Sequence, residues 1–289
     1  MQLIRSFSFA LCGVALAIFC TMSVTGCHGR QTADEAWVDS VLEACDSIPE
    51  DTLVYDVVDA PLSEAVDGSF VDFLYTFTHN RTFQLSRLRL PLAVVDNASE
   101  TLRYIRTQRA FDGEFNPTNK DCYVLLLNDM DEMNEAFGDG ATEATLHLVD
   151  LPESRVRCFD CVRSEGIWQV TAESDIPFSQ HSRGGFLEFY HRFVTDSVFQ
   201  IAHVAQPLSI SMPDEDEEDE MIEGTIDADQ FPVFAPELPL GQFIIMECGI
   251  RGHNPHRVVM VKCGMASSMM DVLTFEKESN GWKLVSMEE

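Results

Sequence analysis

Basic residues are scarce in this chain of 289 residues. It holds 19 Lys and Arg against 48 Asp and Glu, which gives a net charge of −29 with neutral histidines. Because binding to a phosphate backbone requires a basic face, this excess of acid disfavours nucleic acid as a partner. The charge instead favours solubility and repulsion from anionic surfaces.

Signatures of common catalytic and nucleotide-binding sites are also absent. The sequence contains no HExxH, no GxSxG, no P-loop and no GxGxxG fingerprint. The eight histidines show no ligand spacing along the chain, so we predict no metal and no cofactor. The carboxylates that could move a proton, if the fold encloses them, are Asp160 and Asp271. Both are more simply explained as solvent-facing acids.

Cysteines are too few for a disulfide scaffold. Of the nine, six lie beyond residue 27: Cys45, Cys122, Cys158, Cys161, Cys248 and Cys263. An exported chain permits disulfides, but this density is not that of a disulfide framework. Cys158 and Cys161 form a CxxC pair within a predicted strand, which directs the two sulfurs to opposite faces. Because no second CxxC exists, we assign this pair neither a metal nor a redox role.

The first 26 residues predict an export signal. Arg5 supplies positive charge, a mostly apolar run follows over 7–19, and the segment ends at Gly26-Cys27. A small residue before a cysteine at this place resembles a bacterial lipobox, which implies cleavage before Cys27 and lipid, such as palmitate, on its new N-terminus. An uncleaved signal anchor is the alternative. No other window is long and apolar enough to span, so we expect a chain tethered to a membrane.

What the sequence does contain is an internal repeat. Residues 70–92, FVDFLYTFTHNRTFQLSRLRLPL, recur 116 residues later at 186–208 as FLEFYHRFVTDSVFQIAHVAQPL. Four phenylalanines, a glutamine and a Pro-Leu pair keep their places: Phe70, Phe73, Phe77, Phe83, Gln84 and Pro91-Leu92 match Phe186, Phe189, Phe193, Phe199, Gln200 and Pro207-Leu208. Such a match indicates a duplication.

The repeated stretch predicts two helices followed by a strand. The first three phenylalanines are spaced by three and four, which places them on one helical face and in a core. Asn80 and Asp196 are positioned to cap the second helix. The proline then ends helical structure, and a strand is expected over 92–95 and 208–210.

Four segments follow from this organisation. Residues 1–26 are the signal, 27–60 an acidic tether with a short helix at 36–45, 61–174 the first domain and 175–289 the second. The expected elements of the two domains are a helix over 100–109, a loop or short helical turn over 129–140, and strands over 123–127, 144–149, 156–162, 168–170, 243–246, 258–262 and 272–276. Each domain is long enough for its own core.

Charge is unevenly placed within the two domains. Arg103, Arg106 and Arg109 are at helical spacing in the first domain, and residues 214–220 of the second are all acidic. Docking of the acidic run on the arginines is one hypothesis; a solvated acidic loop is the simpler one, because exposed ion pairs contribute about 0–1 kcal/mol each. The run lacks the glycine and alternation of an EF-hand.

The element order resembles a known fold. Paired helices precede long antiparallel strands that end in Asn280-Gly281-Trp282-Lys283-Leu284-Val285, and residues 166–170 are a diverged copy of that ending. This order resembles the nuclear-transport-factor-2-like (NTF2-like) fold, and the chain resembles an uncharacterised family of bacterial lipoproteins with two such domains. The resemblance implies an α+β protein with two tandem cone-shaped domains, each with helices packed on a curved antiparallel sheet.

The resemblance leaves the activity open, because this fold hosts enzymes, ligand binders and assembly modules. We expect an envelope protein, lipid-anchored at the periplasmic face or the cell surface, that acts as a non-enzymatic module and binds a small ligand or a protein partner. The alternative is an isomerase or hydrolase that uses a carboxylate lining one cone. A cone filled by its own Phe and Met side chains favours binding, and an enclosed pocket with a buried polar group favours an enzyme.

Overall fold

The computed structural model describes residues 65–97, 101–111, 115–136, 140–213, 221–249 and 252–289. All of them belong to one compact unit, Val58–Glu289. The predicted signal, Cys27, the helix at 36–45 and the acidic run at 214–220 lie outside the described residues. Within the described ranges, no helix is long and apolar enough to cross a membrane.

The order of elements along the chain repeats once. The first set is α2 (Phe70–His79), α3 (Arg81–Ser86), β1 (Leu88–Asp96), β2 (Thr101–Ile105), β3 (Cys122–Leu127), β4 (Glu143–Asp150), β5 (Arg155–Ser164) and β6 (Ile167–Pro177). The second set is α5 (Gly184–Thr195), α6 (Ser197–Ala202), β7 (Val204–Pro213), β8 (Met221–Ile226), β9 (Gln242–Cys248), β10 (Arg257–Gly264), β11 (Met270–Glu278) and β12 (Gly281–Glu288). Short helical turns complete the described elements: η2 (Gln108–Phe111), η3 (Met130–Glu132), α4 (Met133–Ala136), η4 (Phe178–Gln180) and α7 (Phe231–Phe234).

The helix pair is built in the same way in both repeats. The Asn80 side chain accepts a hydrogen bond from the Phe83 backbone N–H at 2.7 Å, and Asp196 accepts one from Phe199 at 3.0 Å. These are the predicted N-caps, and they satisfy backbone donors that the start of a helix leaves free. The backbone N–H of Phe199 holds the pKa of Asp196 below its usual range.

The repeated glutamine bonds to the end of the first helix. Gln84 is buried, and its Nε2 donates to the carbonyls of Phe77 at 3.1 Å and Phe115 at 3.0 Å. Gln200 donates to the corresponding carbonyl of Phe193 at 3.1 Å and is only partly buried. The glutamine therefore supplies a donor where a helix end has none, which gives a physical reason for its place in both repeats.

Two local predictions are wrong. Residues 101–105 form the edge strand β2, paired with β1 from Leu92↔Ile105 onward, where a helix over 100–109 was expected. The helical spacing of the arginines says nothing about which side chains pack together. This stretch is rich in strand-forming residues, and it pairs with the open edge of β1. The first helix pair ends at Ser86, so Pro91 is not its stop. Pro91 lies inside β1, between the ladder positions Leu88 and Ala93, where the register shifts.

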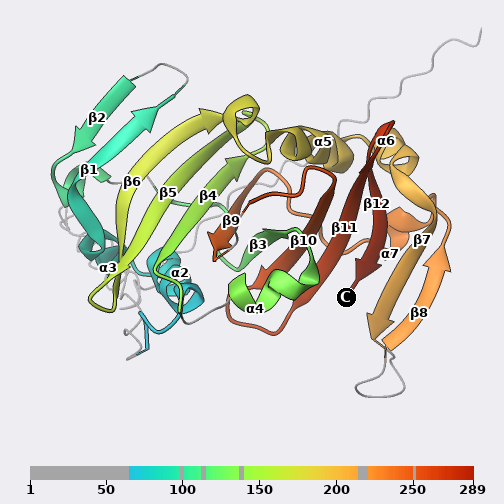
Figure 1. The fold of residues 1–289 in the computed structure, drawn as a ribbon, viewed down its shortest axis with the longest axis horizontal. Coiled ribbons are helices and arrows are strands. Elements are labelled where there is room, and N and C mark those ends of the chain that lie inside the picture. The colour runs from blue at the N-terminus through green and yellow to red at the C-terminus, as the bar shows by residue number, and fades with distance from the viewer. Residues whose placement is uncertain (1–64, 98–100, 112–114, 137–139, 214–220, 250–251) are drawn as a thin grey trace, which may run out of the picture. The chain divides into compact units, whose positions relative to one another are not determined.

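The twelve strands within the described residues form one mixed sheet in the order β2-β1-β6-β5-β4-β9-β3-β10-β11-β12-β7-β8 (Figure 1). Most neighbours are antiparallel as expected, but β1–β6, β7–β12 and β3–β9 are parallel. The expectation of purely antiparallel sheets is therefore wrong. The predicted strands of both repeats are otherwise present within β3 to β6 and β9 to β12.

Strands β3 and β9 are exchanged between the repeats. β9 pairs with β4 of the first repeat, through contacts such as Leu146↔Met246, and β3 pairs with β10 of the second, as in Leu125↔Val261. A repeat built only from its own strands would pair β3 with β4 and β9 with β10. The exchange joins the two repeats through backbone hydrogen bonds in the middle of the sheet.

The two helix pairs pack on opposite faces of this sheet. In β3, Tyr123, Leu125 and Leu127 belong to the core that contains α2, whereas Val124 and Leu126 belong to the core that contains α5. All six residues of β3 are therefore buried. Burial on both faces explains why its sequence is a continuous apolar run and not an alternation.

The glutamines provide a test of the helix-pair design. Gln84→Met fills similar space but leaves two carbonyls without a donor, so we expect unfolding in urea to be easier by about 2–3 kcal/mol. The matched variant Gln200→Met removes one bond at a partly buried site and should cost about 1 kcal/mol. Equal effects of the two variants would contradict the role assigned to burial here.

The exchanged strands predict joint unfolding of the repeats. Trp168 reports on the core of α2 and Trp282 on that of α5. In a Trp37→Phe background, the Trp282→Phe and Trp168→Phe variants each retain one tryptophan, in one core. For each variant we expect the urea midpoint measured by fluorescence to equal the midpoint measured by far-UV circular dichroism. The reason is that each core depends on strands of both repeats. Separate transitions within either variant would show that the repeats unfold independently.

Candidate functional site

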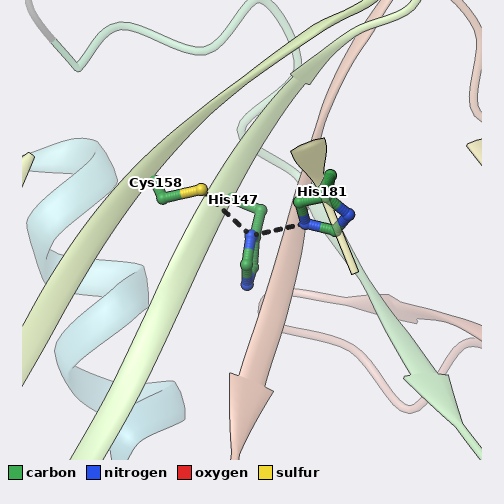
Figure 2. A group of neighbouring side chains, drawn as sticks. All are labelled: His147, Cys158 and His181. Carbon is green, nitrogen blue, oxygen red and sulfur yellow. Dashed lines mark hydrogen bonds between the residues drawn. The ribbon is translucent and has the colours of Figure 1, made fainter. Parts of the chain in front are cut away.

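Two histidines and a cysteine meet on the sheet face that carries α5. His147 on β4 and Cys158 on β5 are direct cross-strand partners, and His181 lies in the turn between η4 and α5. Figure 2 shows the Cys158 and His181 side chains directed at His147. The Cys158 sulfur is 3.4 Å from His147 Nδ1, and His181 Nε2 is 3.1 Å from the same nitrogen. The three donor atoms lie within 4.8 Å of one another.

Strand register and a tight turn position these side chains. Along β4, Leu146 and Leu148 point into the core of α2, so His147 between them points to the opposite face. His181 is fixed by its backbone N–H, which donates to the carbonyl of Phe178 at 3.0 Å. A Cβ at Gly184 would lie 1.7 Å from that carbonyl oxygen, so this turn requires glycine.

A glutamate from the exchanged strand contacts the far side of His147. Glu247 on β9 places Oε2 3.2 Å from His147 Nε2, and its Oε1 is 3.7 Å from Nε2 of His253 in the β9–β10 loop. Because β9 pairs with β4 only through the exchange, this contact depends on it. The carboxylate accepts a hydrogen bond from the Nε2–H of His147, and the other ring nitrogen, Nδ1, is directed at Cys158 and His181.

Arg183 closes the site from the start of α5. Its Nη2 donates to the Leu126 carbonyl and to Asn128 Oδ1, both at 3.1 Å. Its Nε and Nη1 are buried and have no hydrogen-bond partner among the described residues, and the same holds for Nδ1 of His253. Buried donors of this kind are costly without a partner and mark a place where a water, ion or ligand fits.

The space enclosed by these residues is small. A cavity of about 10 Å³ is lined by Leu126, His147, His181, Arg183, Ile245, Met246, Glu247 and His253. That volume suits about one water molecule. A wider hollow of about 780 Å³ adjoins it: Glu247 borders both, together with Thr145 and Asp160 on the wider side.

The environment separates the protonation states of the two histidines. Burial lowers the pKa of His147, but hydrogen bonds to Cys158 and Glu247 outweigh it and raise the pKa to about 9. Burial, with the nearby His147, lowers the pKa of His181 to about 3. Burial acts to raise the pKa of Glu247, but its hydrogen bond to His147 outweighs burial, and the pKa lies below its usual value. His181 is therefore neutral at pH 7.

The hydrogen bonds of the cluster cannot all be satisfied. His181 Nδ1 accepts the backbone N–H of Arg183 at 3.1 Å, so the proton of neutral His181 is on Nε2, which faces His147 Nδ1. Cys158 approaches the same nitrogen. If His147 is protonated on Nδ1, two N–H groups face each other; if it is not, one lone pair serves two donors. Imidazole nitrogens and a thiolate are also the donors that zinc and copper prefer.

Cys158, His147 and Glu247 also form the chain of a thiol nucleophile, a base and an orienting carboxylate. Such a nucleophile must reach a substrate carbonyl. Cys158 is buried, and the cavity that His147 and His181 line has room for one water, so no substrate fits within this cluster. The geometry favours binding of a small species over acyl transfer.

The two carboxylates singled out in the sequence lie outside this cluster. Asp160 is exposed, and its Oδ1 accepts from the Thr145 hydroxyl at 3.3 Å. Asp271 pairs with Lys262 at 3.2 Å. Cys158 and Cys161 face opposite cores, as predicted for a CxxC within a strand.

The expectation that the histidines do not come together is wrong for His147, His181 and His253. The signal for the first was available: antiparallel pairing of the predicted strands 144–149 and 156–162, joined by a short turn, places His147 opposite Cys158. The position of His181 depends on the turn before α5, which the sequence pattern did not reveal.

Comparison with known proteins gives the class of fold first. A crystal structure of an NTF2-like protein from Bacteroides fragilis matches with a TM-score of 0.69 and 25% sequence identity, over 79% of this chain and 98% of that chain. The chain has an NTF2-like α+β fold. Residues 49–289 match the model of a family described as "Domain of unknown function (DUF4348)", and the chain belongs to this family. The predicted resemblance to an uncharacterised family with an NTF2-like fold is confirmed. No curated protein matches.

Thiol reactivity tests whether Cys158 is a nucleophile. We expect iodoacetamide to leave Cys158 and Cys161 equally protected in the folded protein, because both are buried, and to modify both in urea. Mass mapping of the peptide that carries both residues measures this, with Cys161 as the control. Selective modification of Cys158 in the folded protein would contradict this interpretation.

Proposed function

We propose that the protein is a non-enzymatic binding module of the bacterial cell envelope. The observation that carries this proposal is that both cores are filled by their own side chains. Each core contains four large aromatic side chains that are at most 1% exposed. They are Phe73, Phe77, Phe111 and Trp168 in the first core and Tyr190, Phe193, Phe231 and Phe275 in the second. Such interiors leave no space in which a carboxylate and a substrate could meet.

The proposal includes two tandem cone-shaped units, with the predicted bounds 61–174 and 175–289. The duplicated order of elements and the separate cores on the two sheet faces support it. In this interpretation each unit lends one strand, β3 or β9, to the other, and β6 continues through the predicted boundary to Pro177. A pair of units joined in this way would act as one rigid body.

The proposed address is the membrane surface, at the periplasmic face or on the cell exterior, with lipid on Cys27 after removal of 1–26. The lipobox-like Gly26-Cys27 and the apolar run before it support this address. The acidic segment 27–60 would separate the folded part from an anionic bilayer by repulsion. The partner is then a small ligand or a protein of the envelope.

The alternative remains an isomerase or hydrolase that uses a carboxylate. The wide hollow beside Asp160 is the specific feature in its favour, since it has the volume of a ligand site. Asp271 is less suited, because Lys262 holds it in an ion pair with little exposed surface.

Lipid labelling tests the proposed anchor. In a bacterial host fed an alkyne fatty acid, we expect the full chain to be labelled and to sediment with membranes. Cys27→Ala should abolish the label, because it removes the acylated position, while Cys20→Ala within the signal should not. Retention of label in Cys27→Ala would contradict the anchor. Turnover of a substrate that Asp160→Asn abolishes would replace the binding role with the enzymatic alternative.

A further inference from the structure

We propose that His147, Cys158 and His181 bind one Zn²⁺ ion. This inference rests on the proposed binding function and deepens it by naming the ligand. The three residues come from β4, β5 and the segment that leads into α5, so the ion would link the sheet to the connection between the two repeats.

The donor spacing is close to that of a tetrahedral zinc site. Zinc lies about 2.0–2.1 Å from histidine nitrogen and about 2.3 Å from cysteine sulfur, so two ligand atoms of one ion are about 3.3–3.6 Å apart. The distances from His147 Nδ1 are 3.1 Å to His181 Nε2 and 3.4 Å to the Cys158 sulfur. The third pair, the Cys158 sulfur and His181 Nε2, lies within 4.8 Å. Rotation of these two side chains toward one another would bring this pair to the spacing of zinc ligands.

The contact between His147 and Glu247 is the one expected around a zinc ligand. A ligating histidine usually donates its other ring N–H to a carboxylate, which fixes the tautomer and directs the lone pair at the metal. Glu247 Oε2 lies 3.2 Å from His147 Nε2 and occupies that position. Glu247 is thus a positioning residue and not a ligand.

Zinc would also resolve the hydrogen-bond conflict at His147 Nδ1. On binding, the Cys158 thiol proton and the extra proton of His147 leave to solvent, because zinc requires a thiolate and neutral imidazoles. The proton of His181 moves from Nε2 to Nδ1, and the backbone N–H of Arg183 loses that acceptor. The bond from the Arg183 N–H and the contacts of His147 Nδ1 with Cys158 and His181 are exchanged for three coordinate bonds.

The second repeat provides an internal control for this site. His147 faces Cys158 on one side and Ile245 on the other; by the same ladders, Val261 faces Val272 and Leu125. Val261 and Val272 are therefore the structural counterparts of His147 and Cys158, and both are buried in the core of α2. Because the fold accepts valine at these places, it does not itself require the histidine and the cysteine.

The donor set favours zinc over copper. A copper site with two histidines and a cysteine adds a long axial thioether. Met246 borders the cavity, but its side chain belongs to the core on the opposite face. Two of the three proposed ligands, His147 and His181, line the cavity of about 10 Å³ together with Arg183 and His253, and this cavity has room for a water as the fourth ligand.

The test uses the full chain, extracted in detergent, stripped with a chelator and titrated with Co²⁺ and Zn²⁺. We expect one Co²⁺ per chain, with a thiolate-to-metal charge-transfer band and the strong visible bands of tetrahedral cobalt, and displacement by Zn²⁺. Cys158→Ser should remove the charge-transfer band, and the matched Cys161→Ser should leave it intact. Glu247→Gln should weaken binding by about 10- to 100-fold.

Folding is controlled with a variant copied from the second repeat. His147→Val with Cys158→Val should keep the wild-type circular dichroism spectrum while losing the rise in melting temperature that Zn²⁺ gives the parent. No charge-transfer band in the wild-type chain, or its loss in Cys161→Ser, would overturn the proposal, and so would an intense blue copper complex in preference to zinc. Native mass spectrometry of the same sample distinguishes failure of the zinc site from failure of the proposed binding function. An organic ligand without metal would overturn the zinc site alone, and Asp160-dependent turnover would overturn the binding role.

Discussion

The pairing of β9 with β4 is the constraint on which the rest of the structure depends. It inserts a strand of the second repeat beside the first, and the reciprocal pairing of β3 with β10 follows from the same exchange. The four central strands then have a helix pair on each side, and β3 among them is buried on both faces and apolar throughout. The same pairing brings Glu247 to His147, so the polar site exists only in the exchanged arrangement.

Comparison of the two repeats distinguishes the residues that the fold requires from those that it does not. Both repeats keep the aromatic helix face, the side-chain cap before the second helix and the glutamine that binds the helix end. These are solutions to packing and to unpaired backbone groups, and they recur because both halves meet the same problem. His147 and Cys158 have apolar counterparts in the other half, Val261 and Val272, which distinguishes them from such structural solutions.

Much of the fold could be predicted from the sequence because it rests on local patterns. Periodic phenylalanines, the caps and the apolar runs predicted both helix pairs and the central strands. The edge strand β2 could not be predicted, because the spacing of the arginines does not indicate that β1 has an open edge with which this stretch can pair. The exchange of β3 and β9 was equally hidden: both are apolar runs that fit either partner, and only three-dimensional packing selects one. His147 on its own carried no signal in the sequence, Cys158 was noted only as half of a CxxC pair, and the strand register brings the two together.

An unsatisfied cluster in a covered sheet face has a consequence for stability. In a chain without ligand, His147 Nδ1 faces more donors than it can accept. Arg183 retains buried N–H groups, and His253 a buried Nδ1, that have no partner among the described residues. Each such group costs about 1–3 kcal/mol. Natural folds tolerate this cost where a bound species removes it, and a species that binds only the folded chain stabilises it in proportion to the logarithm of its concentration. The connection before α5 lies at this cluster, so the occupancy of the site would govern how firmly that segment is held against the sheet.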